Sequence, residues 1–188
     1  MPKKTKVFTP EEKNILDKTN NLNEWNSQKF KYHFHESDRQ KLEAKRGEVY
    51  FADLGENIGC ETNKIRPVVI ISNNNLGIKS GTCICAIITT STPKIINNYV
   101  PIKNTYNYKY KGKTEKLKGY VNLTQIRTIA KERLVDEHPI CTLTTEMNEI
   151  DLKLIQILEL TNIIKKKDNE ISSLKGKVEY LKGLIDKK

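Results

Sequence analysis

The chain has 188 residues, of which 37% are hydrophobic and 30% are charged, and its formal net charge at pH 7 is +10. This length and apolar content are typical of one globular domain with appendages and exclude a largely disordered chain. No apolar run reaches the roughly 18 residues of a membrane span, and the lysine-rich start is unlike a signal peptide, so we expect a cytoplasmic protein without a membrane partner. The basic excess is typical of nucleic-acid-binding proteins, although a lysine-rich composition explains it equally well.

Residues 1–44 are predicted to form a helical N-terminal extension. Thr9 and Glu12 have the spacing of a capping box, and Pro10 stands at the first helical position, so a short helix is expected to begin there. A second helix is predicted from an apolar stripe made of Leu22, Trp25 and Phe30.

Residues 45–160 are predicted to form a separate domain, because the sequence here consists of short β-rich runs separated by turns. Five strands without long helices between them predict an antiparallel β-barrel or a curled sheet. The runs at 68–71 and 84–88 are apolar at nearly every position, which indicates central strands covered on both faces, with a helix as one cover. The predicted strands are 48–54, 66–72, 82–90, 99–102 and 117–129, with turn-rich stretches at 55–63 and 73–81.

A helical pattern begins after Thr144 and is predicted to run beyond the domain without a break. With Ile150 at heptad position a, every a position up to Ile185 is β-branched, and most d positions are leucine. This pattern predicts a C-terminal coiled-coil helix over 161–188 that continues from the domain's last helix, and it favours a parallel pair. The alternative is a solvated amphipathic helix that folds back on its own domain.

The common nucleotide-binding and hydrolase motifs are absent. Gly112, Lys113 and Thr114 lack the earlier glycine of a phosphate loop, and no Gly-x-Ser-x-Gly elbow occurs. The four cysteines do not have the spacing of zinc ligands and are expected to be reduced thiols. We therefore predict no metal and no cofactor.

Two patterns indicate contact with a phosphodiester. Residues 103–120 interleave six lysines with four tyrosines, which suits a single-stranded nucleic acid but is equally typical of an exposed β-hairpin. Arg66 begins one apolar strand, and Thr89 and Thr90 end the neighbouring one. If the two strand ends meet, a cation and hydroxyls converge on a site suited to phosphate.

The ordered motifs RGEVY (46–50), RPVVIIS (66–72), AIIT (86–89) and QIRTI (125–129) resemble the MazF/PemK family of toxin endoribonucleases. The resemblance implies an SH3-like barrel of the MazF/CcdB toxin fold, a homodimer, and metal-free cleavage of single-stranded RNA at short sequences. In that reaction the 2′-hydroxyl attacks the adjacent phosphate and leaves a 2′,3′-cyclic phosphate and a 5′-hydroxyl. It also implies a cognate antitoxin as protein partner.

Carried over by position, the resemblance implies that Arg66 and Thr89 are catalytic. We expect Arg66 to stabilise transition-state charge and Thr89 to orient the phosphate, because free arginine is too basic to act as a general base. Glu61 is a third catalytic candidate if its loop closes over the substrate. The residues expected to bind RNA are Lys64, Asn73, Thr90, Lys109, Lys111 and Gln125.

The chain departs from the family pattern in three places. In the loop, Cys60 stands where the family more often has serine, and Asn63 and Lys64 stand near positions where it more often has glycine. The hairpin at 103–120 is longer than is usual in the family. The helices at both ends are additions to the minimal toxin. These helices could provide an assembly interface or cover the groove in place of an antitoxin. Two other functions remain open: a nuclease-silent RNA-, DNA- or protein-binding barrel assembled through its coiled coil, and a gyrase-poisoning toxin of the same fold.

Overall fold

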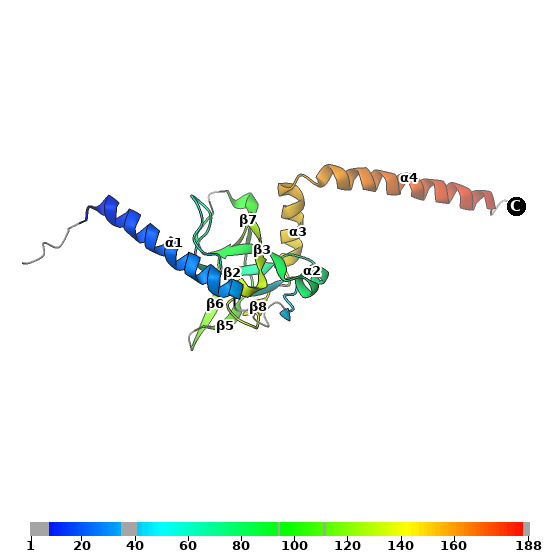
Figure 1. The fold of residues 1–188 in the computed structure, drawn as a ribbon. Helices are drawn as coiled ribbons and strands as arrows, with labels where there is room; N and C mark the ends of the chain where they lie inside the picture. Colours follow the sequence, from blue (N-terminus) through cyan, green and yellow to red (C-terminus); the bar gives the residue numbers. More distant parts are fainter. Residues whose placement is uncertain (1–7, 35–40, 94, 111, 186–188) are drawn as a thin grey trace, which may run out of the picture.

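The computed structural model of the protein describes residues 8–34, 41–93, 95–110 and 112–185 (Figure 1). At its centre lies one curled antiparallel sheet of six strands in the order β4-β7-β3-β2-β1-β8, and β5 and β6 form a separate hairpin. This confirms the predicted mainly β fold with helices. The strands are β1 (Glu48–Asp53), β2 (Ile65–Ile70), β3 (Thr82–Thr89), β4 (Tyr99–Pro101), β5 (Tyr106–Tyr110), β6 (Lys113–Leu117), β7 (Tyr120–Ala130) and β8 (Cys141–Thr142). The helices are α1 (Pro10–Phe34), α2 (Asn74–Lys79), α3 (Glu146–Ile157) and α4 (Thr161–Ile185), with 3₁₀ turns η2 (Ile96–Asn98) and η3 (Lys131–Arg133).

All five predicted strands are present, as β1, β2, β3, β4 and β7, with ends that differ by up to three residues. The last predicted run is divided, because Leu117 ends β6 and β7 begins only at Tyr120. The stretch predicted as a turn after Asn73 contains α2, whose first turn is capped by the Asn73 side chain accepting from the Leu76 amide. A six-residue helix has no sequence period long enough to separate it from a turn.

Both faces of the central strands are buried, as predicted. In β2, Val68 and Ile70 face one core cluster, and Val69 faces another, which is the alternation of a strand covered on two sides. The helix α3 covers the second cluster and buries Ile150 completely. The predicted helical cover of the sheet is therefore confirmed.

The helix α1 is one unbroken helix, so the prediction of two short helices was wrong. Its start was predicted correctly: the Thr9 amide donates to the Glu12 carboxylate, and the Glu12 amide donates to the Thr9 hydroxyl. Of the predicted apolar stripe, only Trp25 faces the sheet domain, because Leu22 and Phe30 are exposed. The side of α1 toward the sheet domain carries residues at helical spacings of four, three and four: Asn21, Trp25, Gln28 and Tyr32.

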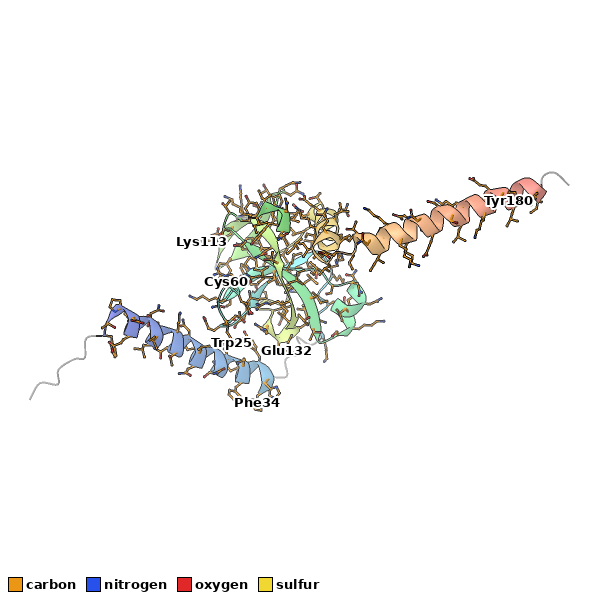
Figure 2. The ribbon with its side chains drawn as sticks, turned by 90° about the horizontal axis from the view of Figure 1, so that it is seen from above. Trp25, Phe34, Cys60, Lys113, Glu132 and Tyr180 are labelled. Atoms are coloured by element: carbon orange, nitrogen blue, oxygen red, sulfur yellow. The ribbon has the colours of Figure 1, made fainter. Side chains whose placement is uncertain are left out.

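The predicted unbroken C-terminal helix was also wrong, because a tight turn separates α3 from α4. Glu159 adopts a left-handed conformation with φ of 55°. The Leu160 amide donates to the Ile155 carbonyl and the Glu159 amide to the Gln156 carbonyl, which together form a Schellman motif. Beyond this turn α4 runs away from the sheet, on the side opposite to the free end of α1, and does not fold back (Figures 1 and 2). Within the described ranges, no helix is long and apolar enough to cross a membrane.

Candidate active site

Arg66 and Thr89 line one cavity of about 420 Å³, which we call the active-site cavity. The antiparallel register pairs Val68 with Ile87. Arg66 stands two residues before the first of these and Thr89 two residues after the second, so both reach the same edge of the sheet. The cavity lining also includes the predicted residues Glu61 and Thr90, and its other members are Thr62, Asn63, Pro67, Ile88, Ser91 and Lys118.

The two predicted catalytic side chains, Arg66 and Thr89, can still donate hydrogen bonds into the cavity. Arg66 is exposed, and its Nε donates to the Asn63 carbonyl oxygen at 3.2 Å, which orients the guanidinium. Across the described part of the chain, no protein group binds its terminal nitrogens. The Thr89 Oγ1 accepts from the Ser91 amide at 3.2 Å, so its own hydroxyl hydrogen remains able to donate. Together they present several donors to an anion in the cavity.

The loop between β1 and β2 carries Glu61 to this cavity, and β7 holds the loop in place. The Gln125 Oε1 accepts from the Thr62 amide at 2.8 Å, and its Nε2 donates to the Cys60 carbonyl at 2.9 Å. Arg127 Nη2 lies 3.5 Å from Glu61 Oε2. Gln125 and Arg127 therefore fix both sides of the loop segment that carries Glu61.

An irregularity in β7 explains how Gln125 reaches the loop. Cys85 pairs with Arg127, but Ile87 pairs with Asn122, so residues 123–126 stand opposite Ala86 alone. Such bulges bend a strand and redirect side chains next to functional sites. The sequence analysis did not single out Arg127. Its spacing of two residues from Gln125 was an available signal, because residues two apart on a strand share one face.

Replacing Gln125 with alanine is expected to speed hydrogen exchange of the Thr62 amide by about tenfold to thirtyfold. The change removes two hydrogen bonds, each with a net contribution of about 1 kcal/mol to closing the loop. Mass-spectrometric exchange of the peptide around Thr62 measures the effect. Gln156→Ala, at an exposed position of α3, is the matched control, and equal exchange in the two variants would contradict the role of Gln125.

The other residues predicted to bind RNA are spread over the surface. Lys64 is exposed with φ of 67°, a backbone conformation that favours the glycine common near this position in the family. Asn73 caps α2 beyond the far end of β2 from Arg66. Lys109 is exposed on β5, and Lys111 lies outside the described residues.

The tyrosines of the β5–β6 hairpin contact the protein. The Tyr106 hydroxyl donates to Glu146 Oε2 at 2.8 Å. The rings of Tyr108 and Tyr110 lie 5.8 and 5.0 Å from the ring of Phe51. The structure therefore has the exposed hairpin, with tyrosines in contact with the protein, and contact of this stretch with RNA stays a prediction.

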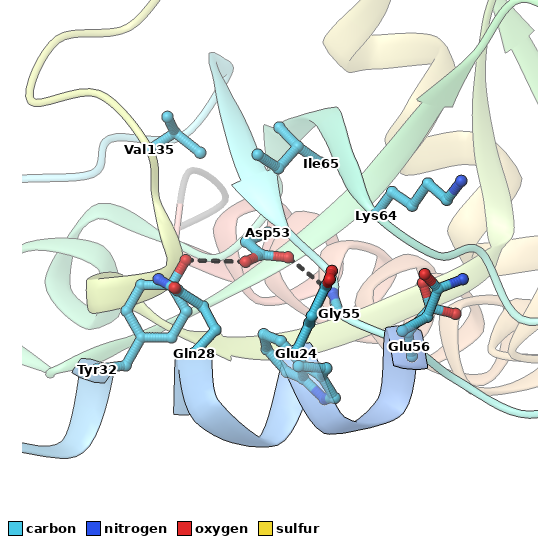
Figure 3. A pocket seen from close by; sticks show the side chains of 11 residues that line it. Glu24, Gln28, Tyr32, Asp53, Gly55, Glu56, Lys64, Ile65 and Val135 are labelled. Carbon is cyan, nitrogen blue, oxygen red and sulfur yellow. Dashed lines mark hydrogen bonds between the residues drawn. The ribbon is translucent and has the colours of Figure 1, made fainter. Parts of the chain in front are cut away.

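A second cavity of about 640 Å³ lies between α1 and the sheet domain, and we call it the α1 cavity (Figure 3). The Tyr32 hydroxyl donates to Asp53 Oδ2 at 2.9 Å, and burial is the main cause that raises the pKa of Tyr32. Trp25 covers Gly55, where any Cβ would collide with the indole ring. The lining of this cavity contains the acids Glu24, Asp53 and Glu56 and one lysine, Lys64, so acidic side chains predominate here.

Three of the four thiols are held protonated by burial. All four cysteines are free. Burial raises the pKa of Cys83 and Cys141 to about 11 and that of Cys85 to about 12, so these three are un-ionised at neutral pH. Among the residues with described positions, no three His, Cys, Asp or Glu side chains form a group that could hold a metal ion.

Residues 45–158 match the family described as PemK-like, MazF-like toxin of type II toxin-antitoxin system. Endoribonuclease EndoA of Bacillus subtilis (strain 168) is 38% identical over 94 residues, which are 50% of this chain and 76% of that protein. Endoribonuclease MazF of Staphylococcus epidermidis is 38% identical over 119 residues, or 63% of this chain and 93% of that protein. A solved endoribonuclease in complex with its cognate antitoxin from Mycobacterial species has 29% identity and a TM-score of 0.47, covering 62% of this chain and 95% of that one.

Proposed function

Because the chain belongs to the family of PemK-like, MazF-like toxins of type II toxin-antitoxin systems, we propose that it is a toxin endoribonuclease that cleaves single-stranded RNA. Two relatives at 38% identity are named endoribonucleases, which supports this activity. The observation that carries the proposal is the active-site cavity, in which Arg66, Thr89 and Glu61 converge. We further propose that the curled sheet is an SH3-like barrel and that a cognate antitoxin is the protein partner of this chain.

In the proposed reaction, the RNA supplies its own nucleophile. The 2′-oxygen forms a bond to phosphorus, the bond from phosphorus to the 5′-oxygen breaks, and the 5′-oxygen takes up a proton. The products are a 2′,3′-cyclic phosphate and a 5′-hydroxyl. Negative charge grows on the phosphoryl oxygens during this step, and preorganised donors aimed at those oxygens lower its barrier.

Each residue of the cavity has a proposed role in that step. The guanidinium of Arg66 neutralises the growing charge, and the Thr89 hydroxyl donates one hydrogen bond that orients the phosphate. Glu61 accepts the proton of the 2′-hydroxyl from its place in the cavity lining, and Arg127 positions its carboxylate. Thr90 contacts the RNA at the cavity rim, whereas Gln125 contributes by holding the loop.

The test is incubation of the protein with a long single-stranded RNA in EDTA, followed by mapping of the new ends. We expect discrete cuts that leave 5′-hydroxyl ends, and no cut where a 2′-deoxy nucleotide precedes the scissile phosphate. Intact RNA after incubation with demonstrably folded protein would favour the nuclease-silent binding module. Loss of cutting in EDTA that added metal restores would contradict a metal-free reaction.

We also propose that α4 pairs with α4 of a second copy as a parallel coiled coil. Ile164, Ile171 and Val178 repeat every seven residues and are exposed, and no described residue of α4 is buried. At about 1.5 Å per residue, its 25 residues extend for roughly 38 Å. An apolar seam of this length, directed away from the barrel, is best covered by an identical helix.

Truncation after Leu160 is expected to leave the barrel folded and to weaken dimerisation by at least about tenfold. The melting temperature should stay within about 2 °C of the full-length value at a concentration where both are monomeric, because α4 contributes no buried residue. Sedimentation across a dilution series measures the dimer. Ile171→Lys should mimic the truncation and Ser172→Lys, one residue outside the seam, should not. A barrel that unfolds on truncation would contradict the separate role of α4.

A further inference from the structure

We propose that Lys118 is a second phosphate-binding cation of the active-site cavity, across from Arg66. This inference rests on the proposed function and names a further residue for it. Lys118 lies outside the four sequence motifs, in the turn that joins β6 to β7. It nevertheless lines the same cavity as Arg66 and Thr89.

The fold fixes the backbone of Lys118 from both sides. The preceding Leu117 is buried in the core, with 5% of its surface exposed. The following Gly119 has φ of 113°, and a Cβ there would collide with the carbonyl oxygen of Thr89. Only glycine allows this close approach, so the turn rests directly on the strand end that carries Thr89.

Two further contacts keep the turn at this place. The Ile102 amide donates to the Gly119 carbonyl at 2.9 Å. Tyr120, the first residue of β7, is paired with Thr89 in the sheet. The pairing of β7 with β3 therefore sets the distance between the Lys118 and Thr89 backbones. This pairing holds the Lys118 backbone at the mouth of the cavity.

The charge balance of the cavity favours an anion between the two cations. Its lining contains Arg66 and Lys118 against one acid, Glu61, which is already paired with Arg127 outside the lining. Lys118 is exposed, and within the described part of the structure its ammonium has no ion-pair or hydrogen-bond partner. Other lysines are engaged: Lys103 pairs with Glu149, Lys131 donates to the Ile78 carbonyl, and Lys153 donates to the Asn97 carbonyl.

Arg66 and Lys118 suit different parts of phosphate binding and transition-state stabilisation. The arginine fork fixes the orientation of phosphoryl oxygens, whereas a lysine ammonium is a compact charge on a flexible stem that can follow those oxygens as their charge grows. The transition state of the proposed reaction carries more negative charge than the bound substrate. A second cation that strengthens its contact as this charge develops raises kcat, not only affinity.

The experiment compares Lys118→Ala with Lys116→Ala and Lys118→Arg in the full chain. Lys116 is the matched control, because it is exposed on the same hairpin and does not line the cavity. The substrate is a short RNA with one cut site, and kcat and KM are measured together with the Kd of the same RNA carrying a 2′-deoxy nucleotide at that site. We expect Lys118→Ala to lower kcat by about 30-fold to 100-fold, Lys116→Ala by less than about threefold, and Lys118→Arg to recover most of the loss.

The outcomes separate this inference from the proposed function. A kcat of Lys118→Ala within about threefold of that of Lys116→Ala overturns the role of Lys118 while leaving the nuclease intact. If the wild type cuts no RNA, the proposed function fails. In that case the Kd of the 2′-deoxy RNA, measured at several salt concentrations for wild type and Lys118→Ala, still tests Lys118. Removal of a phosphate contact lowers the slope of log Kd against log salt by about one, and an unchanged slope overturns the contact.

Discussion

Replacing Arg66 with alanine is expected to lower kcat for RNA cleavage by about 1,000-fold and to leave the melting temperature within about 2 °C of the wild type. The catalytic loss follows from removing the main fixed donor at the phosphoryl oxygens. The small change in stability follows from the exposure of the side chain, whose one bond within the protein goes to the Asn63 carbonyl. Single-turnover cleavage and thermal unfolding of the same preparation measure both quantities.

Arg66→Lys is the matched variant for this prediction. It keeps the positive charge and loses the planar fork, so its activity should lie between those of the wild type and Arg66→Ala. A drop of many degrees in the melting temperature of Arg66→Ala would contradict the prediction. It would show that the arginine is needed mainly to hold the loop through Asn63.

Replacing Glu146 with alanine is expected to have the largest effect on stability, about 3 kcal/mol lower free energy of unfolding. Glu146 is 2% exposed, and its carboxylate accepts from the Tyr106 and Thr145 hydroxyls and from the Lys103 and Asn104 amides. Alanine removes the common acceptor of these four hydrogen bonds, leaves space at a buried position, and detaches the β5–β6 hairpin from the start of α3. Urea unfolding at pH 7 measures the loss. Glu149→Ala, which removes only an exposed ion pair with Lys103, should cost less than about 1 kcal/mol.

The contribution of Glu146 depends on pH. Burial pushes the pKa of Glu146 upward, but the hydrogen bonds from Tyr106, Thr145 and backbone amides outweigh burial and hold the pKa below its ordinary value. A lowered pKa in the folded state stabilises the protein at pH above the unfolded value of about 4.3. That stabilisation is lost as the pH falls through the folded value. Wild type and Glu146→Gln should therefore differ most near pH 7 and converge under acid, and a constant difference between pH 7 and pH 3 would contradict this.

The strands and the central pair of the site were predictable from the sequence because local patterns determine them. Short β-rich runs between turns predicted the five strands, and the family resemblance singled out Arg66 and Thr89. The pairing of β2 with β3 then meets the expectation that the two strand ends converge. The residues that support this pair were not predictable in the same way. Arg127 pairs with Glu61 from β7, and Lys118 lines the cavity because Gly119 packs against the end of β3. Both contacts join segments that are far apart in the sequence.

The helix ends show where local signals fail. The Schellman turn after α3 normally has glycine at the left-handed position, and here that position is Glu159, at a cost of about 1 kcal/mol. The heptad pattern therefore passes through the turn without a visible stop signal. In α1 the error was the opposite one. The start signal at 9–12 and the apolar stripe from Leu22 predicted two helices, although the sequence has no Gly or Pro between Glu11 and Phe34 that would end the first.

The turn at Glu159 has a consequence for the proposed dimer. It leaves α3 anchored in one barrel while α4 departs as a separate rod, so the rods tether two barrels without bending either core. Tethered partners meet at an effective concentration that is of millimolar order for short connections, whatever the bulk concentration of the protein. A weak contact between the two sheet domains would then persist on dilution for as long as the two α4 helices remain paired.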